Sequence, residues 1–171
     1  MSDSDRSGWL DVLRDRVVTD VLVPGWADRD GLFVEFRPQP EVVWLQLDEG
    51  VLRLRSVGQY DALEIREAER VDWSDIEFLD EAEDEVMVAS WGEQFFGDGF
   101  EQLRCLEARA YETAAGNWPK CLALEFEGAN TLFFDPTWVF GIRIGRLSDE
   151  EFWRRQHGPD AGTAVAVTSY R

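Results

Sequence analysis

The sequence predicts an α+β protein built mainly from antiparallel β-sheet. Two observations indicate this class: apolar residues alternate with polar ones over much of the chain, and the connections between these stretches are short. Helix signals are few, with one near the N-terminus, one in the middle and one near the C-terminus. We therefore expect about eight strands in meanders and hairpins, an N-terminal helix and two further short helices.

The length and composition predict one compact domain spanning 1–171. A chain of 171 residues is typical of one domain. Its 44% hydrophobic and 13% aromatic residues are enough for a folded core despite a formal net charge of −18.

Two series of strand and helix signals resemble each other and suggest an internal duplication. Each series closes with Ser-Asp-x-Glu, at 74–77 and at 148–151. The corresponding halves would be 8–84 and 85–157, followed by a tail over 158–171. The alternative is that such signals recur by chance in any α+β chain.

The N-terminal helix is predicted from the spacing of its apolar residues. Those over 9–17 recur at helical intervals, and Ser7 before them is a good N-cap. We expect a helix from about 8 to 20, ending before a Val-Pro-Gly turn at 23–25, where proline and glycine disfavour its continuation.

Over 31–67 the period changes to two, which is typical of strands. Short turns such as Asp48-Glu49-Gly50 separate the alternating stretches, so we expect an antiparallel meander with one buried and one solvated face. The four expected strands are 32–37, 43–47, 52–55 and 63–66.

The remainder of the chain repeats these signals and adds two helices. Ser74 and Ser148 each begin a capping-box pattern, which predicts short helices over 75–84 and 149–156. The further expected strands are 86–91, 103–111, 122–126, 132–134 and 138–144, with an edge strand near 164–167 unless the tail is loose. Loops or turns are expected at 92–100, 112–120, 128–130 and 135–137, and the last strand would bury Trp138, Phe140, Ile142 and Ile144.

The negative charge is concentrated in one block. Residues 71–103 hold eleven of the 35 acids and no Lys or Arg. Like charges crowded on a short helix repel, so arginines from elsewhere in the fold, or from a partner, must offset them. Aromatic residues lie among these acids, and aromatics rimmed by one sign of charge are typical of a binding surface. The candidate partner-binding residues are Asp72, Trp73, Asp75, Glu77, Asp80, Glu81, Glu83, Asp84, Glu85 and Trp91.

Simpler interpretations of this block stay open. A run of charge usually forms a solvated surface, and most aromatic residues pack in a core. Specific metal binding is disfavoured, because the run at 80–85 lacks the glycine and the spacing of a calcium-binding loop. We expect no metal and no cofactor.

Catalytic chemistry finds little support. His157 is the only histidine and is placed at a predicted helix C-terminus, where the helix dipole favours a cation. Cys105 and Cys121 could form a disulfide or a Cys–His dyad, but two small buried side chains are the simpler interpretation. No phosphate-binding loop and no serine-nucleophile motif occurs. Among the many acids, Asp135 is the first to examine, although beside Pro136 it is also a typical turn residue.

The function that we expect is noncatalytic binding of a positively charged protein. The charge weighs against nucleic acid and anionic membranes as partners. A carboxylate array can imitate a phosphate track, as in an immunity or inhibitor-type protein that neutralises a basic, nucleic-acid-handling partner. The alternatives are a small enzyme or ligand-binding domain with an aromatic-lined pocket, and a homo-oligomeric accessory domain. The acidic, polar N-terminus and the lack of a long apolar run predict a cytoplasmic protein.

Overall fold

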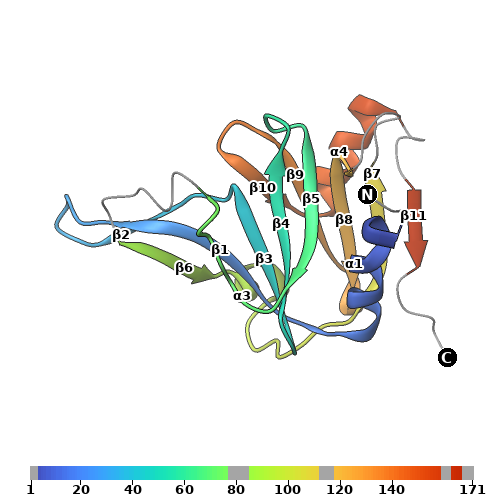
Figure 1. Cartoon of the computed structure of the whole chain (residues 1–171), viewed down its shortest axis with the longest axis horizontal. Coiled ribbons are helices and arrows are strands. Elements are labelled where there is room, and N and C mark those ends of the chain that lie inside the picture. The colour runs from blue at the N-terminus through green and yellow to red at the C-terminus, as the bar shows by residue number, and fades with distance from the viewer. Residues whose placement is uncertain (1–3, 77–84, 112–117, 159–162, 167–171) are drawn as a thin grey trace.

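Two antiparallel sheets pack around a shared apolar core in the computed structural model, which describes residues 4–76, 85–111, 118–158 and 163–166. One sheet has six strands and the other has five, and helices lie at their edges and outer faces (Figure 1). The predicted class, α+β with mainly antiparallel sheet and an N-terminal helix, is confirmed.

The first sheet is organised around one long strand, β1. This strand pairs with β3 along its first half and with β2 along its second half, while β6 pairs with its opposite edge. The outer half of β1 therefore extends with β2 and β6 as an arm that projects from the body of the molecule (Figure 1). The strands are β1 (Val18–Asp28), β2 (Glu35–Pro38), β3 (Val42–Leu47), β4 (Val51–Val57), β5 (Ala62–Ala68) and β6 (Val86–Ser90).

The second sheet is a four-strand meander with one added edge strand. Its order is β10-β9-β8-β7-β11, so β11 lies beside the first strand of the meander. The short helix η1 (Glu127–Ala129) joins β8 to β9. The strands are β7 (Cys105–Tyr111), β8 (Cys121–Phe126), β9 (Asn130–Trp138), β10 (Gly141–Gly145) and β11 (Thr163–Ala166).

Alternation along the strands builds the core between the sheets. Leu45 and Leu54 of the first sheet and Leu124 and Phe134 of the second are fully buried in one cluster. Burying a side chain of this size contributes about 1.5–3 kcal/mol, so the core is the main source of stability. Backbone hydrogen bonds also join the sheets, from Leu63 N to Pro119 O at 2.8 Å, from Ile142 N to Pro40 O at 2.6 Å and from Val18 N to Leu103 O at 2.9 Å.

In the part of the chain that the structure describes, three α-helices cover parts of this sandwich. Helix α1 (Ser4–Asp15) packs against β5 and β7 and buries Trp9 and Leu13 in the core. Helix α3 (Gly92–Phe96) follows β6 and buries Phe95 there. Helix α4 (Leu147–His157) covers the outer face of the second sheet, where Trp153 packs in a cluster with Tyr111, Cys121, Ala123 and Phe133.

Several predicted elements are confirmed near their expected positions. The meander β3–β4–β5, strands β6, β7 and β8, helix α4 and the edge strand β11 all occur. The predicted helix over 75–84 cannot be compared, because 77–84 lie outside the described residues, as do 112–117 of a predicted loop. The proposed duplication is not shown, and β6, from its second half, belongs to the first sheet.

The N-terminal prediction is wrong in its boundaries. Helix α1 ends at Asp15, and 18–28 form β1 instead of a helix end and a turn. Pro24 is accommodated because its carbonyl still accepts a hydrogen bond, from Gln39 N at 2.8 Å. Gly25 is required there, because a Cβ would lie 2.7 Å from the Phe36 ring. In place of the strand expected over 32–37, the structure has the shorter strand β2, which begins at Glu35. The apolar residues before it, 32–34, lie in an exposed loop.

Two further corrections concern the second half. The turn expected at 135–137 does not occur, because β9 continues to Trp138 and the chain reverses only at 139–140. Trp138 and Phe140 are consequently exposed at the hairpin end and do not belong to a buried face. The loop expected over 92–100 begins with the helical turns of α3.

Candidate functional site

The first part of the acidic block covers the outer face of the first sheet. Asp72 and Asp75 are exposed, while Trp73 is half-buried against the cluster formed by Trp44 and Ile76. The Ser74 amide donates to Asp72 at 2.9 Å and lowers the pKa of that carboxyl. This segment is therefore fixed to the sheet by apolar contacts and a local turn.

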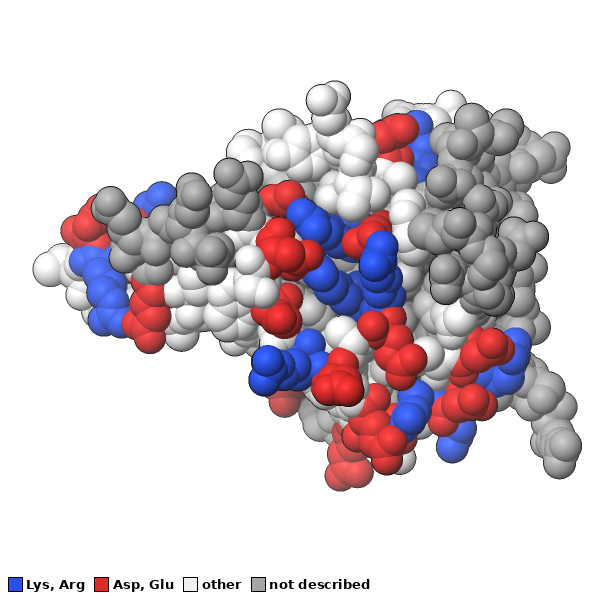
Figure 2. All heavy atoms as spheres, in the orientation of Figure 1, with Lys and Arg blue, Asp and Glu red and all other residues white. Residues whose placement is uncertain are grey.

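Arginines of β4 offset part of this charge. The carboxylate of Asp75 accepts from Arg53 at 2.7 and 2.9 Å and from Arg55 at 3.1 Å. Figure 2 shows a band of basic side chains in the middle of this face with acidic side chains along its sides. We expected the negative charge of the block to be offset either by arginines from elsewhere in the fold or by a partner. The arginines of β4 are of the first kind.

The other described members of the predicted set lie elsewhere. Glu85 directly precedes β6 in the arm and pairs with Arg29 at 2.6 Å. Trp91 is half-buried against the main core, where its ring lies 6.3 Å from that of Phe95. Glu85 and Trp91 thus have partners other than the β4 arginines that bind Asp75. Glu77, Asp80, Glu81, Glu83 and Asp84 lie outside the described residues.

The loop between β1 and β2, which we call the arm tip, exposes three consecutive apolar residues. Leu32, Phe33 and Val34 are 97%, 85% and 59% exposed. Asp30 and Glu35, on either side, are also exposed. Such a contiguous apolar group on a projecting loop is typical of an interaction site. Sequence patterning missed it because Leu-Phe-Val before an alternating stretch also suits a strand.

A second exposed apolar group lies at the β9–β10 turn. Trp138 and Phe140 are 45% and 67% exposed, and their rings meet edge to face with centroids 5.0 Å apart. The hairpin is held against the first sheet, because Gly141 fits closely over the Pro40 backbone, where a Cβ would lie 2.6 Å from its carbonyl carbon. These aromatics are therefore presented on a rigid support.

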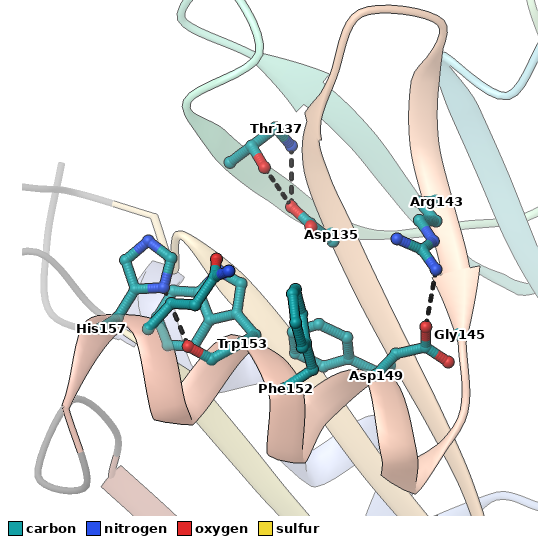
Figure 3. Close-up of a pocket in the computed structure, with 10 residues that line it drawn as sticks. Asp135, Thr137, Arg143, Gly145, Asp149, Phe152, Trp153 and His157 are labelled. Atoms are coloured by element: carbon teal, nitrogen blue, oxygen red, sulfur yellow. Dashed lines mark hydrogen bonds and ion pairs between the residues drawn. The ribbon is translucent and has the colours of Figure 1, made fainter.

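A pocket of about 120 Å³ lies between α4 and the same hairpin (Figure 3). Phe152 and Trp153 of α4 supply apolar wall, while Asp135 and Thr137 of β9 supply polar atoms opposite them. The remaining lining residues are Phe133, Arg143, Gly145, Asp149, Gln156 and His157. The only histidine and the acid singled out from the sequence thus line one pocket.

The charges of this pocket are arranged in two groups. Asp135 accepts from the Thr137 amide at 2.9 Å, from the Thr137 hydroxyl at 2.6 Å and from the Cys121 thiol at 3.6 Å. Arg143 donates to Asp149 at 2.7 Å, so these two lining charges cancel. The sequence predicted Asp135 as a turn residue, but it lies within strand β9, and its carboxylate accepts hydrogen bonds from these neutral donors.

His157 has a structural role at the end of α4. Its ring stacks on Trp153 with centroids 4.1 Å apart, and its Nδ1 lies 2.9 Å from the Trp153 carbonyl oxygen. An imidazole hydrogen-bonded to the last turn of a helix is favoured by the helix dipole. This arrangement matches the placement predicted from the sequence.

A buried ion pair fixes α4 to the second sheet. Glu150 is 1% exposed and accepts from Arg109 at 2.6 and 2.9 Å in a bidentate pair. Tyr111 also donates to it, and burial together with this carboxylate raises the pKa of the phenol. Arg109 further donates to Glu107 at 2.6 Å and to Glu125 at 3.0 Å. This network of charged hydrogen bonds therefore holds α4, which supplies one wall of the pocket, against the second sheet.

Nucleophilic chemistry is disfavoured at both cysteines. Burial raises the pKa of Cys105 to about 12, and burial beside Asp135 raises the pKa of Cys121 still further. Both thiols are therefore protonated near neutral pH. Among the described residues, no group of three or more His, Cys, Asp and Glu is placed to hold a metal ion. Nor does that part of the chain contain a helix with the length and apolar character needed to cross a membrane.

Comparisons with known proteins do not place this chain in a family. No protein-family model, no curated protein and no solved structure matches this chain.

Proposed function

We propose that the chain is a noncatalytic protein-binding module that docks on a positively charged protein. The observation that carries this proposal is the arm tip, where Leu32, Phe33 and Val34 are exposed on a projecting part of the sheet. The proposed type is an immunity or inhibitor protein acting in the cytoplasm on a basic, nucleic-acid-handling partner.

The arm tip supplies the anchor. Binding energy at an interface is concentrated in a few well-buried apolar or aromatic side chains, and the surrounding residues mainly exclude water. Phe33 is 85% exposed, so a partner pocket that enclosed it would remove nearly its whole side chain from water. Because the arm is a three-stranded ribbon, its tip is positioned by backbone pairing and loses little conformational freedom on binding.

The net charge of −18 supplies attraction at longer range. A protein that handles nucleic acid presents a track of Lys and Arg side chains, and exposed carboxylates such as Asp30 and Glu35 can approach the same cations. Electrostatic steering raises the association rate and is screened by salt. We expect the acidic residues of the 71–103 block to contribute to this electrostatic steering.

The test begins with affinity capture from cells that encode the chain and ends with a purified partner. Candidate proteins retained by the wild type are purified, and the wild type and Leu32→Ser/Phe33→Ser are titrated against them by calorimetry at 50 and 500 mM NaCl. We expect a basic partner whose affinity falls at least about tenfold at the higher salt and at least about tenfold in the double variant. Leu147→Ser, which removes an apolar residue 49% exposed on α4, is the matched control and is expected to stay within about twofold.

Two results would overturn the proposal. One is a purified partner with neutral or negative net charge, or an affinity that does not respond to salt. The other is sedimentation showing that the chain forms a homodimer through the arm tip, because the exposed residues would then be covered by a second copy.

A further inference from the structure

We propose that the pocket between α4 and the β9–β10 hairpin binds a guanidinium group, the end of an arginine side chain. The inference rests on the proposed function for the source of that arginine, which is the basic partner. Neither the arm tip nor the acidic block indicates which chemical group this pocket would bind.

The charges that line the pocket favour a cation as its ligand. Arg143 and Asp149 pair at 2.7 Å, and Asp149 also accepts from the Arg146 amide at 2.9 Å. This leaves Asp135 as the lining carboxylate whose hydrogen bonds come from a hydroxyl, an amide and a thiol. The Asp and Arg side chains that line the pocket, Asp135, Asp149 and Arg143, carry one net formal negative charge, which a monovalent cation balances.

The shape of the pocket suits a flat group. Phe133, Phe152 and Trp153 supply aromatic walls, and Figure 3 shows Phe152 and Asp135 on opposite sides of the space. A guanidinium is flat, weakly hydrated and stacks on aromatic faces, while its N–H groups donate to a carboxylate. About 120 Å³ is the space of about four water molecules, which suits the end of an arginine side chain and excludes a large ligand.

Both walls of the pocket are rigid. Glu150 and Arg109 fix α4 to the sheet, and the Ile142 amide bonded to the Pro40 carbonyl fixes the hairpin. Gly145 allows Asp149 to approach the strand, because a Cβ at 145 would lie 2.6 Å from the Asp149 Cβ. A pocket with both walls held in place binds a small group without a large ordering cost.

The test uses methylguanidinium chloride as the probe, titrated below 50 mM into the isotope-labelled full chain and followed by NMR. We expect saturable shifts of the Trp153 indole and the Thr137 amide, with a dissociation constant on the order of 1–10 mM. Sodium acetate over the same range, which controls for ionic strength, is expected to give no saturable shift at these groups.

Variants decide whether the pocket is responsible. Asp135→Asn keeps an acceptor for Thr137 and removes the charge, so binding is expected to weaken at least tenfold. Phe152→Ala, at a side chain 55% exposed, removes a stacking wall without disturbing the core, and is expected to weaken binding several-fold. Asp72→Asn removes an exposed carboxylate outside the pocket and is the matched control. Absence of saturable shifts in the wild type, or unchanged binding in Asp135→Asn, would overturn the inference.

Titration of the purified partner separates this inference from the proposed function. If Asp135→Asn leaves partner affinity within twofold while methylguanidinium still binds the wild type, the arginine assignment is overturned and the arm proposal stands. If partner affinity falls tenfold in Asp135→Asn but is unchanged in the arm-tip variant, the arm proposal fails and the pocket inference stands.

Discussion

Replacement of Glu150 by alanine tests how α4 is attached to the second sheet. Glu150 is 1% exposed, and its two oxygens accept both hydrogen bonds of a bidentate pair from Arg109. The variant leaves a guanidinium whose side chain is only 16% exposed without its buried, bidentate carboxylate partner. The phenol of Tyr111 loses its acceptor at the same time.

The expected cost follows from what remains around Arg109. Removing one member of a buried ion pair costs about 3–5 kcal/mol, because the other charge stays buried. Arg109 keeps Glu107 at 2.6 Å and Glu125 at 3.0 Å, and these carboxylates are 39% and 42% exposed. They reduce the penalty towards its lower end, so we expect a loss of about 3 kcal/mol in the free energy of unfolding. For a chain of this length that loss lowers the melting temperature by about 6–12 °C.

Urea unfolding followed by tryptophan fluorescence and far-UV circular dichroism measures this loss. Glu151→Ala, which changes an exposed neighbour on the same helix, is the control and is expected to stay within about 0.5 kcal/mol of the wild type. Replacing Glu150 and Arg109 together by methionine is expected to recover most of the loss, because no buried charge is then left alone. A Glu150→Ala protein as stable as the control would refute the reasoning.

Three further predictions are tested by urea unfolding or by the reaction of cysteine thiols with Ellman's reagent. Gly141→Ala is expected to cost at least about 2 kcal/mol in urea unfolding, since its φ is +108° and a Cβ would lie 2.6 Å from the Pro40 carbonyl carbon. Gly97→Ala, at φ +95° with open space around it, should cost clearly less; equal costs would contradict the steric argument. Burial raises the pKa of Glu41, so the native chain retains this proton to higher pH than the unfolded chain and loses stability as pH rises through that window. Glu41→Gln should therefore raise the urea midpoint at pH 7, with no gain below about pH 4, and a gain independent of pH would argue against this origin. The buried cysteine thiols should react with Ellman's reagent at pH 8 at least about 100-fold more slowly in the native chain than in urea, and comparable rates would show that they are accessible.

Regular alternation made the meander over 42–68 predictable from the sequence. Leu45 and Leu54 face the core while Trp44 and Arg53 face outward, and a glycine turn joins their strands. The edge strand β11 and helix α4 also occur near their expected positions, although Ser148, the predicted N-cap of α4, lies inside the helix and Arg146 is the N-cap. In these elements the local preference and the tertiary environment agree.

Strand β1 was not predictable because its stability comes from distant partners. Residues 18–28 contain Pro24 and Gly25, which locally favour a turn. Pairing with β6 places Leu22 opposite Ser90 and Trp26 opposite Val86, and it also extends the strand well beyond β3. Such long-range pairing overrides local propensity and leaves no periodic signal.

The pocket was visible in the sequence only as separate residues. Asp135 attracted attention for a turn that does not form, and His157 for a helix end that does. Their meeting depends on β9 continuing straight through Pro136 and on α4 folding back over the sheet. The bidentate pair between Arg109 and Glu150, 41 residues apart, has no local sequence signal either.

The pairing of β1 with β6 also sets the order in which the chain can fold. Leu22 and Ser90 are adjacent in the sheet, and Val18 bridges to Leu103. The meanders close by local contacts and form quickly, whereas these distant contacts carry a larger loop-closure cost. During synthesis one edge of β1 therefore stays open until the chain beyond residue 90 has emerged, and over that interval the nascent protein exposes a long strand edge to aggregation.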